Sequence, residues 1–171
     1  MTDYQNIKLV ILDVDGTLTD GGIYYDSHGG EMKRFDVKDG LGIKVAIAAG
    51  LEIAVITGRE SPMVQRRVKE LGIQHLIQGV QKKAPAMLQL LKETGLTVEE
   101  IAYIGDDLND LPAMELVGFR ACPADAAEEI REICHYVADA KGGHGAVREC
   151  LEHILQKHNP LGKKAKDVYT A

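Results

Sequence analysis

Short apolar runs and amphipathic segments alternate along almost the whole of this chain. The apolar runs have the length of buried strands, and they fall at residues 7–13, 52–57, 75–78, 101–105, 119–122 and 136–137. The segments between them have helical periodicity with helix start and stop residues, and they fall at residues 41–49, 62–71, 84–94, 110–117, 126–134 and 144–156. Strands that alternate with helices predict right-handed βαβ units. We therefore expect an α/β fold with a Rossmann-like, mostly parallel sheet flanked by helices.

Two segments fall outside this alternation. Residues 20–38 contain two short strand-like stretches around a Gly-rich turn, which is typical of a β-hairpin inserted after the first strand. An isolated hairpin is only marginally stable in water, so this one is either a surface flap or an element that packs on another subunit. Residues 158–171 lose the helical pattern and are predicted to form a mobile basic tail. Such a tail is either solvated or folds over an anionic ligand.

Composition narrows the class of protein. A chain of 171 residues is long enough for one domain with an ample core, which we expect to span residues 1–157. The formal net charge of −6 argues against nucleic acid or anionic membrane as a partner. The sequence has no apolar stretch long enough to span a bilayer and no N-terminal signal peptide. Its three widely spaced cysteines indicate reduced thiols, so we expect a cytoplasmic protein.

Two aspartates, Asp13 and Asp15, follow directly on the first apolar run. Because side chains alternate along a strand, both carboxylates are predicted to lie on one side, at the strand end where open α/β sheets bind ligands. Such a pair can bind a divalent cation, and one carboxylate could be a nucleophile while the other moves protons. An EF-hand loop is excluded, because its sixth and twelfth positions would be Leu18 and Tyr24. The alternative is a purely structural role, in which an acidic strand end caps the next turn.

Residues suited to phosphate follow the second and third runs. Thr57 and Gly58 precede a predicted helix, where a hydroxyl and a backbone amide suit a phosphate oxygen. After the third run, a lysine could neutralise a phosphate, and the spacing leaves both Lys82 and Lys83 open. Taken singly, both features are more often structural.

A second acidic cluster follows the fourth run. Its carboxylates repel one another unless a cation neutralises them, so together with the first pair they predict a Mg²⁺ site. A negatively charged loop that caps a helix would account for one or two of these acids but not for the set. The polar members of the cluster are Asp106, Asp107, Asn109 and Asp110.

In this order, DVDGT, Thr-Gly, a lysine and GDD resemble the motif set of the haloacid dehalogenase-like phosphotransferases. The resemblance implies that Asp13 is a nucleophile that forms an aspartyl-phosphate. It implies that Asp15 protonates the leaving oxygen and then activates water. The phosphoryl group would be bound by Thr57, Gly58 and Lys83.

The same resemblance implies how Mg²⁺ would be bound. The implied ligands are the Asp13 carboxylate, the Asp15 backbone carbonyl and the Asp106 carboxylate. Residues that would support these ligands are Asp107, Asn109 and Asp110.

Many members of that superfamily carry a cap domain between these motifs. Here the distance from Asp15 to Thr57 leaves room only for the hairpin and one helix, and no cap fits after Thr57 either. The site should therefore be open in a monomer, unless a neighbouring subunit closes it.

The sequences DGGIY, FDVKDGLGI, ITGR, GDDL and GGHGAVRE resemble the family of 3-deoxy-D-manno-octulosonate 8-phosphate (KDO 8-phosphate) phosphatases. Those enzymes are homotetramers whose hairpins pack into a central barrel and whose active sites are completed by an adjacent subunit. The resemblance implies a small anionic sugar phosphate as partner. It implies Mg²⁺-dependent hydrolysis of KDO 8-phosphate to KDO and inorganic phosphate, toward lipopolysaccharide in a Gram-negative-type bacterium.

Two arginines, Arg59 and Arg67, are candidates for binding this anionic substrate. Arg67 matches a family position that reaches the substrate carboxylate from the next subunit, and its alternative is a surface arginine on a helix. Relatives that act on nonulosonate 9-phosphates of the KDN or sialic acid type tend to carry an acid where Arg59 stands. Arg59 therefore favours the eight-carbon acid. His144 departs from the family, in which arginine is usual, and has no assigned role.

Two other functions stay open at this point. One is a phosphatase of a nonulosonate 9-phosphate or of another small phosphorylated metabolite. The other is a tetrameric scaffold without activity, which the full set of catalytic residues disfavours.

Overall fold

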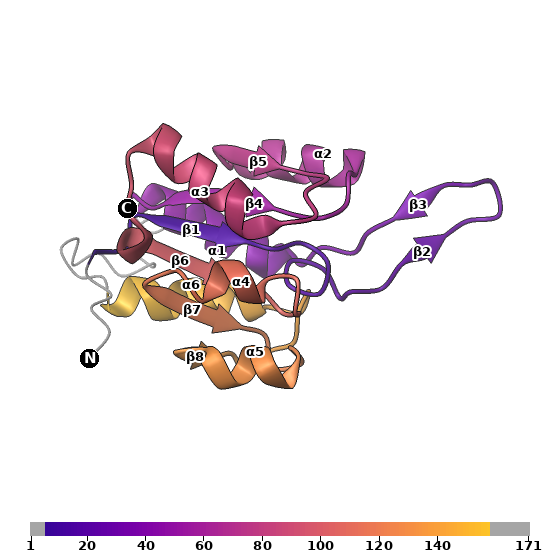
Figure 1. Ribbon diagram of the computed structural model, residues 1–171. Coiled ribbons are helices and arrows are strands. Elements are labelled where there is room, and N and C mark those ends of the chain that lie inside the picture. The colour runs from indigo at the N-terminus through magenta and orange to yellow at the C-terminus, as the bar shows by residue number, and fades with distance from the viewer. Residues whose placement is uncertain (1–5, 158–171) are drawn as a thin grey trace.

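The structure is a computed structural model, and it describes residues 6–157 of the chain (Figure 1). Its centre is a six-stranded sheet in the order β5-β4-β1-β6-β7-β8, and neighbouring strands are parallel. The strands are β1 (Leu9–Leu12), β4 (Glu52–Ile56), β5 (His75–Ile77), β6 (Ile101–Ile104), β7 (Phe119–Cys122) and β8 (Tyr136–Val137). The prediction of a Rossmann-like, mostly parallel sheet is confirmed.

Helices cover both faces of this sheet (Figure 1). One face packs against α1 (Val37–Ala48), α2 (Pro62–Leu71) and α6 (Ala146–Lys157). The other face packs against α3 (Lys83–Thr94), α4 (Leu111–Met114) and α5 (Glu128–Ile133). A 3₁₀ helix, Val98–Glu100, precedes β6. This arrangement gives two buried apolar clusters, one on each side of the sheet.

Alternation along the strands explains the two clusters. In β1, Val10 and Leu12 belong to the first cluster, whereas Leu9 and Ile11 belong to the second. All four are fully buried, as the continuous apolar run predicts for a parallel strand covered on both faces.

Several helix limits differ from those expected. The first helix begins at Val37 rather than at residue 41, because the Asp36 side chain caps it by accepting from the Lys38 amide at 2.7 Å. Helix α4 is one turn instead of spanning 110–117, and Gly118 already donates to Val98 at 2.9 Å on the way into β7. The last helix begins at Ala146 rather than at residue 144, because Gly145 has a φ of +104°, outside the helical range.

The hairpin lies outside the layered body (Figure 1). It consists of β2 (Tyr24–Tyr25) and β3 (Glu31–Met32), which pair antiparallel as expected. Several of its apolar side chains are exposed, including Ile23 at 53% and Met32 at 59%. The described residues include no cap domain. The predicted tail, 158–171, lies outside them.

Strand order places a ligand site at the carboxyl end of β1. From β1 the chain continues to β4 on one side, and later enters β6 on the other side of β1. Such a reversal of strand order is a topological switch point, where the crevice beyond the strand ends binds ligands in open α/β sheets.

A buried acid joins the first and last helices. Asp39, in the first turn of α1, is 1% exposed, and its carboxylate accepts from the Arg148 amide at 2.8 Å and from the Gly145 amide at 3.4 Å. It thereby satisfies amides at the start of α6. Burial raises the pKa of Asp39 to about 6.

This raised pKa predicts how Asp39→Asn changes stability with pH. Ionisation of Asp39 disfavours the folded state. This effect is absent below the unfolded pKa of about 4, grows as the pH rises and is complete above about pH 6. The substitution removes that ionisation. Relative to wild type, the free energy of unfolding of Asp39→Asn should therefore be larger at pH 7.5 than at pH 4.5, by about 1–3 kcal/mol, which means that the variant gains stability as the pH rises. Urea denaturation at both pH values measures this difference.

Asp26→Asn serves as the control with the opposite sign. Hydrogen bonds from the Gly30 and His28 amides lower the pKa of Asp26. Relative to wild type, the free energy of unfolding of Asp26→Asn should therefore be larger at pH 4.5 than at pH 7.5. Equal pH dependence in the two variants would contradict the account of Asp39.

Candidate active site

The ends of the central strands bring the predicted phosphate and metal residues together. Asp13 directly follows β1, and its amide donates to Ile104, the last residue of β6, at 3.0 Å. Thr57 follows β4 and is 2% exposed, and Gly58 comes next in the chain. Asp106 lies just beyond β6. Residues far apart in sequence thus lie at one edge of the sheet.

Lys83 is the lysine of this site, and Lys82 is exposed. The Lys83 Nζ lies 2.7 Å from Asp13 Oδ1 and 2.6 Å from Asp110 Oδ1, and the three side chains are at most 6% exposed. Burial by itself would lower the pKa of Lys83, but the Asp13 and Asp110 carboxylates outweigh it and raise that pKa. The ammonium group is therefore held in its charged form beside Asp13.

Three carboxylates cluster at this site, of which those of Asp13 and Asp110 are buried and that of Asp106 is half-buried. Oxygen atoms of Asp13, Asp106 and Asp110 all lie within 4.8 Å of one another. Burial, and then the Asp110 charge, raise the pKa of Asp13 well above its usual value. Burial also raises the pKa of Asp106, to about 6. Lys83 offsets only one of three negative charges, and hard oxygen donors suit Mg²⁺, so the donor set fits this ion.

Asp110 acts as a support within this cluster, because both of its oxygens are occupied. Its Oδ1 accepts from Lys83 at 2.6 Å and from the Tyr103 hydroxyl at 2.8 Å. Its Oδ2 accepts from the Asp106 amide at 3.1 Å. The carboxylates of Asp13 and Asp106 are thus the better placed to bind a cation.

Asp107 and Asn109 differ from Asp106 and Asp110, because both residues are exposed. The Asp107 carboxylate accepts from the Leu108 amide at 2.8 Å. The structure therefore does not bring these two side chains into the buried cluster.

The loop after β1 packs closely on Asp106. Gly16 has a φ of +92°, and a Cβ atom there would lie 2.0 Å from Asp106 Oδ2, so only glycine fits. The Thr17 hydroxyl donates to Asp106 Oδ1 at 2.8 Å. Thr17 was not among the predicted site residues, although it belongs to the DVDGT motif.

Asp15 contacts the hairpin. Lys33 Nζ lies 2.5 Å from Asp15 Oδ1, and Glu31 Oε1 lies 2.9 Å from an Arg59 guanidinium nitrogen. Lys33 and Glu31 were not predicted from the sequence, because nothing in the hairpin sequence indicated that these side chains contact residues at the strand ends. Arg59 lies near the site through this contact.

Arg67 does not join the cluster of its own chain. It extends from α2 to donate to the Asp36 carbonyl at 3.0 Å, and its guanidinium carbon lies 5.8 Å from the centre of the Phe35 ring. Its side chain is 22% exposed.

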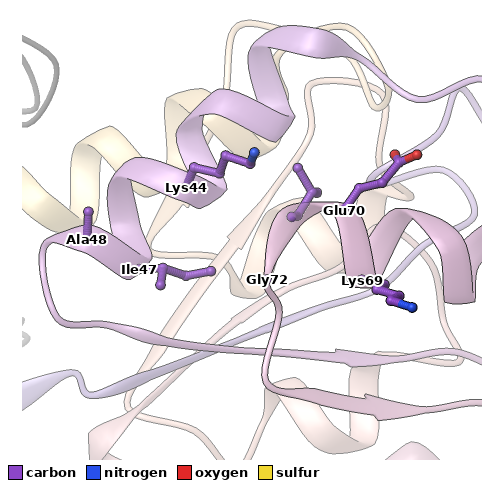
Figure 2. A pocket seen from close by; sticks show the side chains of 7 residues that line it. Lys44, Ile47, Ala48, Lys69, Glu70 and Gly72 are labelled. Atoms are coloured by element: carbon purple, nitrogen blue, oxygen red, sulfur yellow. The ribbon is translucent and has the colours of Figure 1, made fainter.

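A groove with a volume of about 380 Å³ lies apart from these residues, between the last turns of α1 and α2 (Figure 2). Lys44 and Lys69 border it from the two helices (Figure 2). None of the predicted site residues lines it.

Comparison with known proteins places the chain in a class. The family of haloacid dehalogenase-like hydrolases matches residues 34–118. The 3-deoxy-D-manno-octulosonate 8-phosphate phosphatase KdsC of Haemophilus influenzae is 45% identical over 89% of this chain and 84% of that protein. KdsC of Salmonella typhimurium is 46% identical over 94% of this chain and 86% of that protein.

Solved structures agree with this classification. A probable phosphatase of Pseudomonas syringae pv. phaseolica has a TM-score of 0.94 and 45% identity, over 99% of this chain and 96% of that one. The phosphatase of Moraxella catarrhalis, solved in complex with magnesium ion, phosphate ion and KDO, has a TM-score of 0.89 and 46% identity. That match covers 92% of this chain and 90% of the other.

The chain is a haloacid dehalogenase-like hydrolase in its fold and in its family. Within that class, the chain belongs to the family of 3-deoxy-D-manno-octulosonate 8-phosphate phosphatases. The resemblance in the sequence motifs is thereby confirmed. None of the described helices is both long and apolar enough to cross a membrane.

Proposed function

We propose that this protein is a Mg²⁺-dependent phosphatase that hydrolyses KDO 8-phosphate to KDO and inorganic phosphate. The observation that carries the proposal is the buried pair of Asp13 and Lys83 at the switch point of the sheet, 2.7 Å apart and next to Asp106. The family supports the substrate, and the product of this reaction belongs to a route toward bacterial lipopolysaccharide. The protein would act in the cytoplasm, where the three free cysteines stay reduced.

Hydrolysis would proceed in two displacements. In the first, an Asp13 carboxylate oxygen bonds to phosphorus, the ester P–O bond breaks, and the leaving oxygen takes a proton from Asp15. In the second, a water oxygen attacks the aspartyl-phosphate and gives a proton to Asp15. The bond between phosphorus and the Asp13 oxygen then breaks, which restores the carboxylate and releases phosphate.

Positioning and charge stabilisation dominate this kind of chemistry. Lys83 would pair with the phosphoryl oxygens next to Asp13, and Thr57 and Gly58 would donate to them. Mg²⁺, when bound, neutralises charge on the phosphoryl group. It would be held by the carboxylates of Asp13 and Asp106 and the backbone carbonyl of Asp15.

The proposal also includes assembly of the protein as a homotetramer. Apolar side chains of the hairpin and the first turns of α1 are exposed, and we propose that they pack against the hairpins of other copies. These side chains are Ile23, Tyr24, Tyr25, Met32, Val37 and Leu41. An open, capless site would then be completed by the adjacent subunit, with Arg67 reaching the carboxylate of the substrate across that interface.

Phosphate release from a panel of phosphorylated compounds tests the proposed reaction. The panel holds KDO 8-phosphate, a nonulosonate 9-phosphate, arabinose 5-phosphate and an aryl phosphate, each with Mg²⁺ and with EDTA. We expect strong, Mg²⁺-dependent preference for KDO 8-phosphate. Highest activity on another compound would overturn the substrate assignment, and silence on all of them would favour the scaffold hypothesis.

Reversing the charge at Arg59 is expected to weaken the reaction with this substrate. Arg59 lies beside the site and its side chain is 41% exposed, so it can meet an arriving anion. In Arg59→Glu, we expect kcat/KM for KDO 8-phosphate to fall roughly tenfold, equivalent to about 1.4 kcal/mol. Steady-state kinetics on KDO 8-phosphate and on the aryl phosphate, which lacks the sugar carboxylate, measures the effect.

Arg66→Glu is the matched control. Arg66 is 82% exposed on α2 and pairs with Glu70, so its reversal makes the same change in net charge. We expect wild-type kinetics from it. A similar loss in both variants would mean that overall charge, and not Arg59, sets the affinity.

A further inference from the structure

The hairpin contributes a lysine to the site that the mechanism above does not use. Lys33 follows β3 directly, and its Nζ lies 2.5 Å from Asp15 Oδ1. The Lys33 side chain is 2% exposed, whereas that of Asp15 is 29% exposed. The lysine is therefore covered, whereas the aspartate it contacts is partly open to solvent.

Strand alternation directs this lysine inward. Glu31 and Lys33 are two residues apart and point to one side of the strand, whereas Met32 between them points to the other and is 59% exposed. Glu31 Oε1 lies 3.6 Å from Lys33 Nζ and 2.9 Å from Arg59. The ammonium group of Lys33 thus lies between two carboxylates.

The backbone next to Lys33 is anchored as well. An Arg34 guanidinium nitrogen donates to the Gly143 carbonyl at 2.5 Å, on the loop before α6. A Cβ atom at Gly142 would lie 1.7 Å from the Gly16 carbonyl oxygen, so the same loop packs on the chain just after Asp15. These contacts hold Lys33 and Asp15 in a fixed relation.

Such a contact restricts the Asp15 carboxyl group. A surface ion pair has little effect on geometry, but a covered ammonium at this distance holds the carboxylate oxygen that it contacts in place. Oδ1 is engaged by Lys33, and within residues 6–157 Oδ2 makes no hydrogen bond. Oδ2 is therefore the oxygen available for proton exchange.

We propose that Lys33 is a positioning residue for Asp15. By holding Oδ1, it aims Oδ2 at the leaving oxygen in the first displacement and at the attacking water in the second. The inference rests on the proposed function for the roles of Asp13 and Asp15. It adds no covalent step: the ester bond breaks as before, the proton passes from Asp15 to the leaving oxygen, and Lys33 keeps its protons.

Two substrates with different leaving groups distinguish a role of Lys33 in positioning Asp15 from a general loss of activity. An alkyl phosphate such as KDO 8-phosphate needs a proton on its leaving oxygen, whereas 4-nitrophenyl phosphate releases 4-nitrophenolate, which is stable as an anion. The ratio kcat/KM reports the steps up to departure of the leaving group. In Lys33→Met we expect it to fall roughly 10–100-fold for the alkyl substrate and less than about threefold for the aryl one. Lys33→Arg, which restores a cation that can hold Oδ1, should recover most of the loss.

Lys44→Met controls for the loss of one positive charge, because Lys44 is exposed on α1 and borders the distant groove (Figure 2). It should match wild type on both substrates. An equal loss on both substrates in Lys33→Met, or no loss on either, would overturn the assignment of Lys33 while the proposed function stands. If the wild-type protein hydrolyses neither substrate, the proposed function fails and the assignment of Lys33 fails with it.

Discussion

Asp13→Asn is expected to lower kcat for KDO 8-phosphate by roughly 10⁴-fold or more, the loss typical of removing a covalent nucleophile. The amide cannot form the aspartyl-phosphate, and it also removes a carboxylate from the proposed Mg²⁺ site. Phosphate release at saturating Mg²⁺, with the variant concentration raised to detect slow turnover, measures the loss.

The same substitution should leave the fold intact. Burial raises the pKa of Asp13, which means that its ionised form disfavours the folded state at neutral pH. Thermal unfolding at pH 7.5 should therefore show Asp13→Asn to be at least as stable as wild type. Activity within tenfold of wild type would show that Asp13 is not the nucleophile, and a loss of folding would show that its charge is structural.

Lys83→Met is expected to have the second largest effect. It removes the only cation that contacts Asp13 and Asp110 among residues 6–157. Losing a donor aimed at the developing charge should lower kcat/KM roughly 10²–10³-fold. Leaving two buried carboxylates without their partner should also lower the free energy of unfolding, by about 3 kcal/mol.

Lys82→Met is the matched control, since Lys82 is the preceding residue and is exposed. We expect wild-type activity and stability from it. Kinetics and urea denaturation of both variants also decide between the two lysines that the sequence left open. Equal losses in the two variants, or a loss in Lys82→Met alone, would contradict the assignment of Lys83.

The elements were largely predictable from sequence because their signals are local. The helix 62–71 was predicted with its observed limits, since Ser61, Pro62 and Gly72 mark its two ends. Asp13, Thr57 and Asp106 could be placed at one site because parallel strands that end together bring their following residues together.

The remaining features depend on tertiary contacts. The choice of Lys83 over Lys82 follows from where α3 packs, since only Lys83 meets Asp13. The contact between Lys33 and Asp15 depends on the direction in which the hairpin leaves the strand ends, which the hydrophobic pattern does not encode. The exposure of Asp107 follows from the tight turn before α4, so acidity alone did not distinguish it from the half-buried Asp106 and the buried Asp110.

A single-turnover experiment with radiolabelled KDO 8-phosphate tests the central claim most directly. Excess enzyme is mixed with substrate labelled in the phosphate, quenched in acid at successive times and digested to peptides. The account predicts that label appears on the peptide containing Asp13 and then declines as phosphate is released, with Mg²⁺ present and not with EDTA. Full release of labelled phosphate with no labelled peptide at any time would contradict covalent catalysis at Asp13, and no release with Mg²⁺ present would contradict the proposed reaction.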